Sequence, residues 1–211
     1  MVAESTSLKE RTAQRAVAER KRVYVDEIDA LIEATYRVIE RTGEVDPTVR
    51  QILTEAGLST PAFYRHFRSK DELFVVIIDD GRRRLASTVE RRIQRASTGV
   101  GRLRAWINGV LVQASDPVAA GRTRPFVTHL ERLRSRYPAE QRESERVLID
   151  QLSALITASA DLTSPAAEQD AAAIYHMTIG VLSTHLLART APTTSEIEHL
   201  VDFAKRALTL P

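Results

Sequence analysis

Several side chains between residues 48 and 70 are of the types that bind phosphate groups. Phenol, imidazole and ammonium groups donate hydrogen bonds to phosphate oxygens, and here they belong to Tyr64, His66 and Lys70. Thr48 is expected in the first turn of a short helix, where its hydroxyl and the free backbone amides would bind a further anion. Contacts of this kind hold a protein on a nucleic acid without selecting a base sequence.

A second group of side chains in the same stretch could contact bases. Phe63 and Phe67 lie four residues apart, so both are expected to face the core from one side of a helix. The opposite side and its edges then carry Thr60, Pro61, Ala62, Tyr64, Arg65 and His66. The short side chains at the beginning of this helix would allow close approach to base edges. Arg65 can either pair with guanine through two hydrogen bonds or contact the backbone, and the sequence leaves both alternatives open.

Three predicted helices would position these side chains. Apolar residues recur at helical spacing from about Asp26 to Arg41 and predict an amphipathic helix. Asp46 followed by Pro47 predicts the beginning of a second, short helix. After a glycine-containing turn, Ser59 predicts the N-cap of a third. The two short helices form a helix-turn-helix from Asp46 to Phe67, and the second of them is the candidate recognition helix.

The run AGLSTPAFYRHFRSKDELF resembles the signature of the TetR family of regulators, whose usual form is A-G-V-S-x-G-T-L-Y-x-H-F-x-S-K-E-x-L. The resemblance covers about twenty contiguous residues and, more loosely, Asp26 to Asp80. It implies that Thr48, Tyr64, His66 and Lys70 contact phosphate and that Thr60, Pro61 and Ala62 contact bases. The complete set of candidate DNA-binding residues is Thr48, Ser59, Thr60, Pro61, Ala62, Tyr64, Arg65, His66 and Lys70. Pro61 replaces the usual glycine and Ala62 the usual threonine, so the operator sequence that a relative binds does not predict the one that this chain would bind.

Beyond residue 68 the sequence predicts further helices and no strand. A capping box from Ser69 to Glu72 opens a long helix that ends at about Ser97. Five further helical segments are separated by glycine or proline breaks, which gives about nine helices in an all-α protein. Between Asp170 and Arg189 no residue is formally charged. A helix buried on several sides is favoured there over a membrane span, because the segment contains two histidines and several hydroxyl groups.

The predicted organisation has three parts: a basic N-terminal extension (residues 1–22), a TetR-like helix-turn-helix DNA-binding domain (23–80) and a helical ligand-binding and dimerisation domain (81–211). The positive charges of the extension belong to Lys9, Arg11, Arg15, Arg20, Lys21 and Arg22. Two interpretations of the extension are equally open, a basic arm along DNA and a disordered tail. It lacks the apolar segment of a secretory signal, so we expect a cytoplasmic, nucleoid-associated protein without a membrane.

The resemblance implies a homodimer formed through the last two helices. One short recognition helix makes few contacts, so a twofold dimer on a pseudo-palindromic operator is expected. The family also implies a small-molecule effector, expected here to be largely apolar, and candidate pocket residues are Trp106, Phe126, His129, Leu152, Tyr175 and His176. An ordinary core role is the simpler interpretation of each. Two interpretations are open for the arginines at 122, 124, 132, 134 and 136. They could attract an anionic ligand or, more simply, form a solvated helix face.

Composition narrows the function further. The chain contains no cysteine, which excludes thiol nucleophiles, disulfides and zinc-thiolate sites. The net charge is only +2, so charge alone does not indicate nucleic-acid binding. No catalytic signature is present and the histidines lack ligand-like spacing, so no enzyme, cofactor or metal is expected. We predict a sequence-specific DNA-binding transcriptional regulator, a repressor released from its operator by a ligand. The alternative is a helical ligand-binding or protein-interaction protein without DNA-binding activity.

Overall fold

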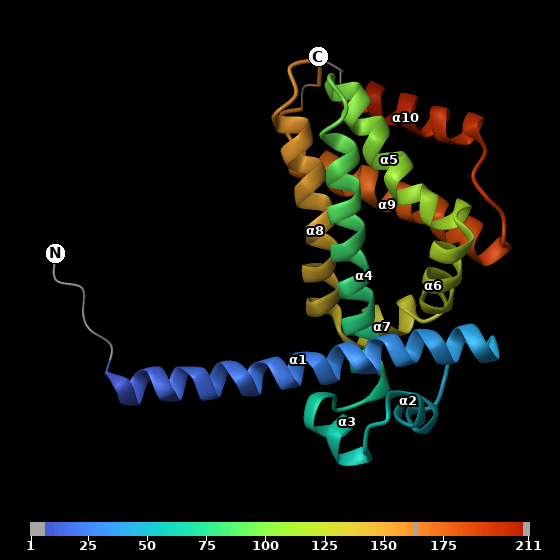
Figure 1. The fold of residues 1–211 in the computed structure, drawn as a ribbon. Helices are drawn as coiled ribbons and strands as arrows, with labels where there is room; N and C mark the ends of the chain where they lie inside the picture. Colours follow the sequence, from blue (N-terminus) through green and yellow to red (C-terminus); the bar gives the residue numbers. More distant parts are fainter. Residues whose placement is uncertain (1–6, 163, 209–211) are drawn as a thin grey trace. The chain divides into compact units, whose positions relative to one another are not determined.

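The structure, a computed structural model, describes residues 7–162 and 164–208, and every regular element among them is a helix (Figure 1). This confirms the predicted all-α class. The chain divides between Leu73 and Phe74 into two compact units, called here the N-terminal unit and the C-terminal unit. The helices are α1 (Leu8–Thr42), α2 (Val49–Ala56), α3 (Thr60–His66), α4 (Lys70–Ile93), α5 (Gly99–Ser115), α6 (Pro117–Val127), α7 (Leu130–Arg136), α8 (Pro138–Thr157), α9 (Ala167–Ala188) and α10 (Thr194–Leu208). The functional limits of 23–80 and 81–211 stay predictions.

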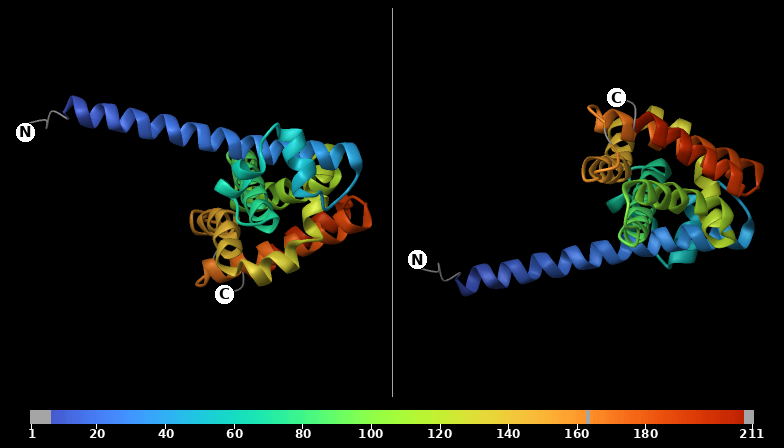
Figure 2. Two further views of the ribbon diagram at one scale, coloured as in Figure 1. Left: turned by 90° about the horizontal axis from the view of Figure 1, so that it is seen from below. Right: turned by 90° about the horizontal axis from the view of Figure 1, so that it is seen from above.

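Helix α1 begins much earlier than the sequence pattern predicted (Figure 2). The expected first residue was about Asp26, whereas the helix starts at Leu8. Ser7 accepts a hydrogen bond from the backbone of Glu10, whose carboxylate accepts one from the backbone of Ser7, so a capping box opens the helix. The interpretation of the extension as a disordered tail is therefore wrong for residues 8–22, while residues 1–6 lie outside the described part. Contact of this segment with DNA stays a prediction.

The core of the N-terminal unit forms where α1 packs against α2, and α2 against α3. The apolar stripe predicted for α1 is buried, including Leu31 and Val38 at 0% exposure. Ile52 from α2 and Phe63 from α3 are also 0% exposed. Gly43 ends α1 with a φ of 72°, a left-handed conformation that glycine adopts without a steric penalty. The short helices are thus held by a shared core and not by their own length.

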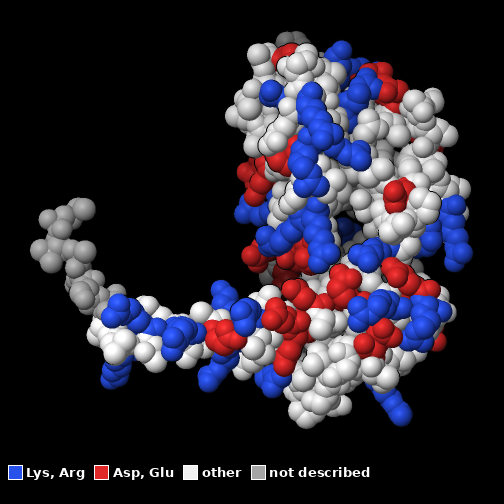
Figure 3. Space-filling view, viewed as in Figure 1, with Lys and Arg blue, Asp and Glu red and all other residues white. Residues whose placement is uncertain are grey.

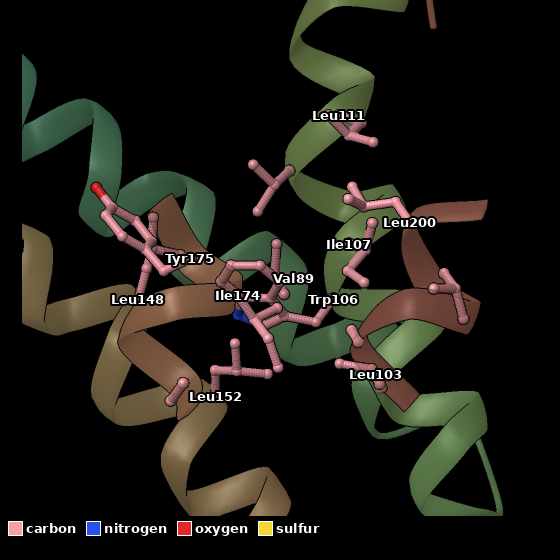
Figure 4. Close-up of a cluster of buried hydrophobic side chains, with 14 of the residues drawn as sticks. Val89, Leu103, Trp106, Ile107, Leu111, Leu148, Leu152, Ile174, Tyr175 and Leu200 are labelled. Carbon is pink, nitrogen blue, oxygen red and sulfur yellow. The ribbon is translucent and has the colours of Figure 1, made fainter. Parts of the chain in front are cut away.

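The C-terminal unit is built around α5, which packs against α6, α8, α9 and α10 (Figure 4). Its core cluster contains the fully buried Trp106 and Tyr175 together with aliphatic residues from six helices, α4, α5, α6, α8, α9 and α10. Helices α4 and α5 approach closely at Gly109, where an added Cβ would lie 2.8 Å from Val89 Cγ2. An added side chain would force Val89 or the helices to shift, so glycine permits this close packing.

The described residues form ten helices where about nine were expected. Among the five further segments expected to be single helices, the one between the proline breaks at Pro117 and Pro138 is divided into α6 and α7. Near the end of α6, Thr128 Oγ1 donates to the carbonyl of Pro125 at 2.9 Å, and the His129 amide donates to Phe126 at 3.1 Å. These bonds satisfy carbonyls in a tight turn and end the helix.

Helix α9 corresponds to the apolar segment that had a membrane span as its alternative interpretation. Among the described residues it is the one helix long and apolar enough to span a membrane, judged by length and composition only. One face of α9, including Ile174, Thr178 and Leu182, is buried in the core of the C-terminal unit. The opposite face is exposed at Ala173, His176, Gly180, Thr184 and Leu187. The packing supports a core helix with one uncharged face left exposed.

Candidate nucleic-acid interface

Helices α2 and α3 each begin at a hydroxyl side chain. Thr48 is the N-cap of α2 and forms a capping box with Gln51, whose backbone N–H donates to Thr48 Oγ1 at 3.2 Å. Ser59 caps α3 and accepts from the Ala62 amide at 3.3 Å. Between them Gly57 ends α2 with a φ of 67°. The sequence therefore produces two short helices of defined start joined by a tight turn, which is the helix-turn-helix arrangement.

Helix α3 has a buried side and an exposed side. Phe63 and Phe67 are 0% and 3% exposed, with ring centroids 5.6 Å apart, so both anchor the helix as predicted. Thr60 and Pro61 are exposed at its beginning. Tyr64 is 59% exposed, although a tyrosine usually buries much of its ring. The beginning of α3 and the Tyr64 hydroxyl are therefore accessible to a ligand.

The other end of α3 is joined to α1 through Glu27. Arg65 Nη2 lies 2.9 and 2.8 Å from the two carboxylate oxygens of Glu27. His66 Nε2 lies 2.5 Å from Oε2 of the same carboxylate. The Tyr24 ring completes the group, with its centroid 5.3 Å from that of His66 and 5.6 Å from Arg65 Cζ. The hydrogen bond with His66 and, to a smaller extent, that with Arg65 hold the pKa of Glu27 below its ordinary value of 4.5, so its carboxylate stays ionised.

Lys70 is the first residue of α4 and is joined to the loop before α2. Its Nζ lies 2.8 Å from Oδ1 of Asp46. The Lys70 side chain is 23% exposed, whereas that of Asp46 is 46% exposed. A phosphate group that approaches Lys70 would therefore compete with the accessible carboxylate of Asp46. Replacing Asp46 by a phosphate as the partner of Lys70 costs little free energy, because a solvent-accessible ion pair contributes little to stability.

Residues 31–77 match the sequence model of the family described as "Bacterial regulatory proteins, tetR family". The match begins in α1, includes the whole helix-turn-helix and ends in α4. Residues 31–77 of this chain are therefore a tetR-family domain. The resemblance noted in the sequence is confirmed by this match.

Curated relatives of the tetR-family domain include the HTH-type transcriptional regulator BetI of Brucella canis and that of Brucella melitensis. Each is 35% identical over 77 residues, which is 36% of this chain. The matched part spans only 39% of the length of these relatives. The activity of the whole protein is therefore treated below as a proposal.

Solved structures extend the shared fold beyond the tetR-family domain. Escherichia coli NemR in its reduced form has a TM-score of 0.64 at 17% identity, and covers 88% of this chain and 99% of its own. A TetR transcription regulator from Haloarcula marismortui has a TM-score of 0.63 at 22% identity, with coverages of 87% and 97%. At these identities the similarity concerns the fold alone.

Three predictions for the tetR-family domain need correction. Ala62 was expected on the exposed side of α3 but is 6% exposed, because it lies on the flank next to Phe63 that packs inward. His66 was expected to donate to phosphate, yet its side chain is 4% exposed and faces Glu27. Asp46 was expected to cap α2, but Thr48 is the N-cap, so Thr48 precedes the first turn. DNA contacts of the remaining candidates stay predictions.

The six candidate pocket residues do not come together as one site. Trp106, Leu152 and Tyr175 belong to the same core cluster of the C-terminal unit. Phe126 and His129 instead pack on Phe74, with ring centroids 5.4 and 5.2 Å from it. The sixth candidate, His176, is exposed on the outer face of α9.

Sequence reasoning missed Glu27 and Tyr24. Both precede the apolar stripe of α1, and Glu27 lies 38 residues before Arg65. No local pattern reports a pairing at that separation. A partial signal was available, since helical periodicity carried back from Leu31 and Ala34 places Glu27 on the stripe's side of α1.

Replacing Glu27 with glutamine is expected to lower the melting temperature of the protein at pH 7, because the buried imidazole of His66 loses an ionised partner. The pKa of Glu27 is lowered in the folded state, so its stabilising effect is present above pH 4.5 and is lost as the pH falls through the lowered value. The difference between wild type and Glu27→Gln should therefore shrink in acid. Thermal unfolding between pH 7 and pH 3 measures this. The control is Glu19→Gln, which breaks an exposed pair with Arg22. A difference that stays constant with pH would contradict the account.

Proposed function

We propose that this protein is a sequence-specific DNA-binding transcriptional regulator, and that it acts as a repressor released from its operator by a small-molecule ligand. The observation that carries the proposal is the tetR-family match over residues 31–77 together with an accessible beginning of α3. Two copies of α3 would enter successive major grooves, as the recognition helices of helix-turn-helix dimers do. Because the relatives named above are bacterial regulators, we place the protein in the cytoplasm, on nucleoid DNA.

The proposed contacts divide into two groups. Thr60 and Pro61 face the bases. Arg65 contacts a base edge or a phosphate on DNA after it releases its hydrogen bonds to Glu27. Tyr64 and Lys70 hold phosphate, together with the N-terminus of α2 at Thr48. His66 supports α3 through Glu27 instead of contacting DNA, because its side chain is buried. Specificity thus depends on few side chains, which is why a dimer is needed.

The proposed dimer forms through α9 and α10. The exposed residues of α9 follow one another at spacings of three and four, so they form a single uncharged stripe along the helix. Leu187 on α9 and Phe203 on α10 are 56% and 52% exposed in the single chain. An uncharged helix face of this kind is typical of an interface with another protein. A second copy would bring two α3 helices to half-sites about 34–36 Å apart.

Replacing Tyr64 with alanine is expected to weaken binding to all DNA sequences alike, by about 10- to 100-fold, because a hydrogen bond to a charged group is lost. Thr60→Val should instead change the preference among operator variants, since a base contact distinguishes sequences by about 5- to 100-fold. Fluorescence anisotropy with a panel of single-base operator variants measures both. Arg83→Gln, which alters an exposed ion pair of the C-terminal unit, is the control. Undiminished binding by Tyr64→Ala would show that α3 is not the DNA-contacting helix.

A further inference from the structure

A buried group of polar side chains lies between α4 and α8 in the C-terminal unit. Arg82 of α4 has a side chain that is only 11% exposed. Its Nη1 donates to Gln141 Oε1 and to Ser144 Oγ, both at 3.0 Å. Gln141 and Ser144 are 2% and 1% exposed. An arginine whose closest partners are neutral is unusual at this depth, because a buried charge normally pairs with an opposite one.

The charges of this group do not balance. The carboxylate of Glu145 accepts from Arg134 Nη2 at 2.9 Å and lies 3.4 Å from Arg82 Nη2. Two guanidinium groups therefore share one carboxylate, and the closer contact belongs to Arg134. Arg82, Arg134 and Glu145 together carry one net positive charge; Arg134 is 45% exposed to solvent, so Arg82, at 11% exposure and with the longer contact to the carboxylate, is the buried cation with the weaker ionic contact. An anion would complete the group.

Two hydrogen-bond donors in the same place have no acceptor. The Tyr175 hydroxyl and Gln141 Nε2 are both buried and donate to no acceptor, although the Tyr175 oxygen interacts with the Arg82 guanidinium. The amide orientation of Gln141 is fixed because its oxygen accepts from Arg82, so the NH2 group is the part left over. Burial raises the pKa of Tyr175 to about 12, and the charges that act on the hydroxyl are Arg82, Glu145 and Arg134. The phenol is therefore a protonated donor close to the arginines. A purely structural group would be expected to satisfy such donors internally.

The apolar core of the C-terminal unit adjoins these donors. Figure 4 shows the Tyr175 hydroxyl pointing away from the labelled apolar side chains Ile174, Trp106, Leu148 and Leu152. These residues belong to one core cluster of the unit. The indole N–H of Trp106 is a further buried donor without a partner. The surroundings suit a molecule with an anionic, acceptor-rich end and an apolar body.

We propose that Arg82, Gln141 and Tyr175 form the polar end of a ligand site that binds the carboxylate of a small organic acid with an apolar body. The carboxylate accepts from the guanidinium of Arg82, the phenol of Tyr175 and the NH2 group of Gln141. Binding neutralises the excess charge and satisfies both donors in one step. That this acid is the effector rests on the proposed function above. The inference also changes the expected effector from a largely apolar molecule to an acid.

Thermal unfolding of the full chain without DNA tests the site. The probes are aliphatic acids from butyrate to decanoate and benzoate, each compared with its neutral primary amide. At about ten times its Kd, an acid should raise the melting temperature by about 3–5 °C, and the amide should not. Tyr175→Phe removes one oxygen and keeps the ring, so it should fold and lose most of the acid-dependent shift. Arg82→Gln should lose it as well. The matched control is Arg84→Gln on the same helix, whose arginine forms an exposed ion pair with Asp80 and should keep the shift.

Three results would overturn the inference: no shift with any acid, an equal shift with acids and amides, or a full shift in Tyr175→Phe. Since no DNA is present, these outcomes are independent of whether the protein binds an operator. Failure of operator binding, conversely, would remove the effector role and leave the acid site to be decided by this experiment alone.

Discussion

Replacing Phe63 with alanine is expected to destabilise the N-terminal unit by about 3–5 kcal/mol and to abolish operator binding. The ring is 0% exposed and packs against Phe67, with centroids 5.6 Å apart. Helix α3 spans only seven residues, so it has almost no stability apart from this packing. Loss of the anchor should release the whole helix from α1 and α2. Urea unfolding followed by far-UV circular dichroism measures the stability, and anisotropy measures DNA binding.

The neighbouring position provides the control for this prediction. Tyr64 is on the exposed side of the same helix, so Tyr64→Ala should leave the stability within about 0.5 kcal/mol of wild type while DNA affinity falls. The two variants thus separate anchoring from contact on one helix. An unfolding midpoint of Phe63→Ala equal to that of wild type would show that α3 does not depend on the buried ring.

Replacing Gly180 with arginine is expected to give a folded monomer with at least about 100-fold weaker operator binding. An added Cβ at this exposed position would meet no atom within 4 Å in the single chain, so the monomer should accommodate arginine. In the proposed dimer the same side chain would place a charge in an uncharged, closely packed interface. Each monomer would then bind one half-site, and the gain from binding both at once, about 100- to 10,000-fold for linked modules, would be lost.

Gly121→Arg is the matched control, because an added Cβ at the exposed Gly121 of α6 also would meet no atom within 4 Å. This variant should remain a dimer with wild-type affinity for DNA. Size-exclusion chromatography with light scattering measures the mass of both variants. A dimeric Gly180→Arg protein would place the interface on another surface.

The sequence predicted the parts of the fold that depend on neighbouring residues. Ser59 caps α3, and Phe63 and Phe67 are buried, because a cap and a four-residue spacing are local patterns. The early start of α1 was predictable in the same way, from the Ser7 and Glu10 capping box, but the apolar stripe that marked the helix begins later. Ala62 was misplaced because a short helix has a narrow exposed side, which packing determines and composition does not.

Pairings between distant residues could not be predicted. Glu27 contacts both Arg65 and His66 across 38 and 39 residues, and the His66 side chain, expected on the exposed side of α3, is buried against it. The approach of Arg82 to α8 likewise joins residues about 60 positions apart, at Gln141 and Ser144. These contacts arise from tertiary packing, which no spacing within one helix reports.

The lysine and arginine side chains on the N-terminal part of α1 would contribute to DNA affinity if DNA lies near this helix. Figure 3 shows lysine and arginine side chains along the N-terminal part of α1, where residues 8–26 are exposed. Their contribution would be independent of base sequence and would appear as a steeper dependence of affinity on salt.

Operator binding by the full-length protein tests the central claim most directly. Fluorescence anisotropy compares the intergenic DNA upstream of the protein's own gene with a shuffled duplex of the same length and composition, across a series of salt concentrations. The account predicts binding to the upstream DNA about 1,000-fold or more tighter than to the shuffled duplex, with affinity falling as salt rises. Equal affinity for the two duplexes at moderate salt would contradict it.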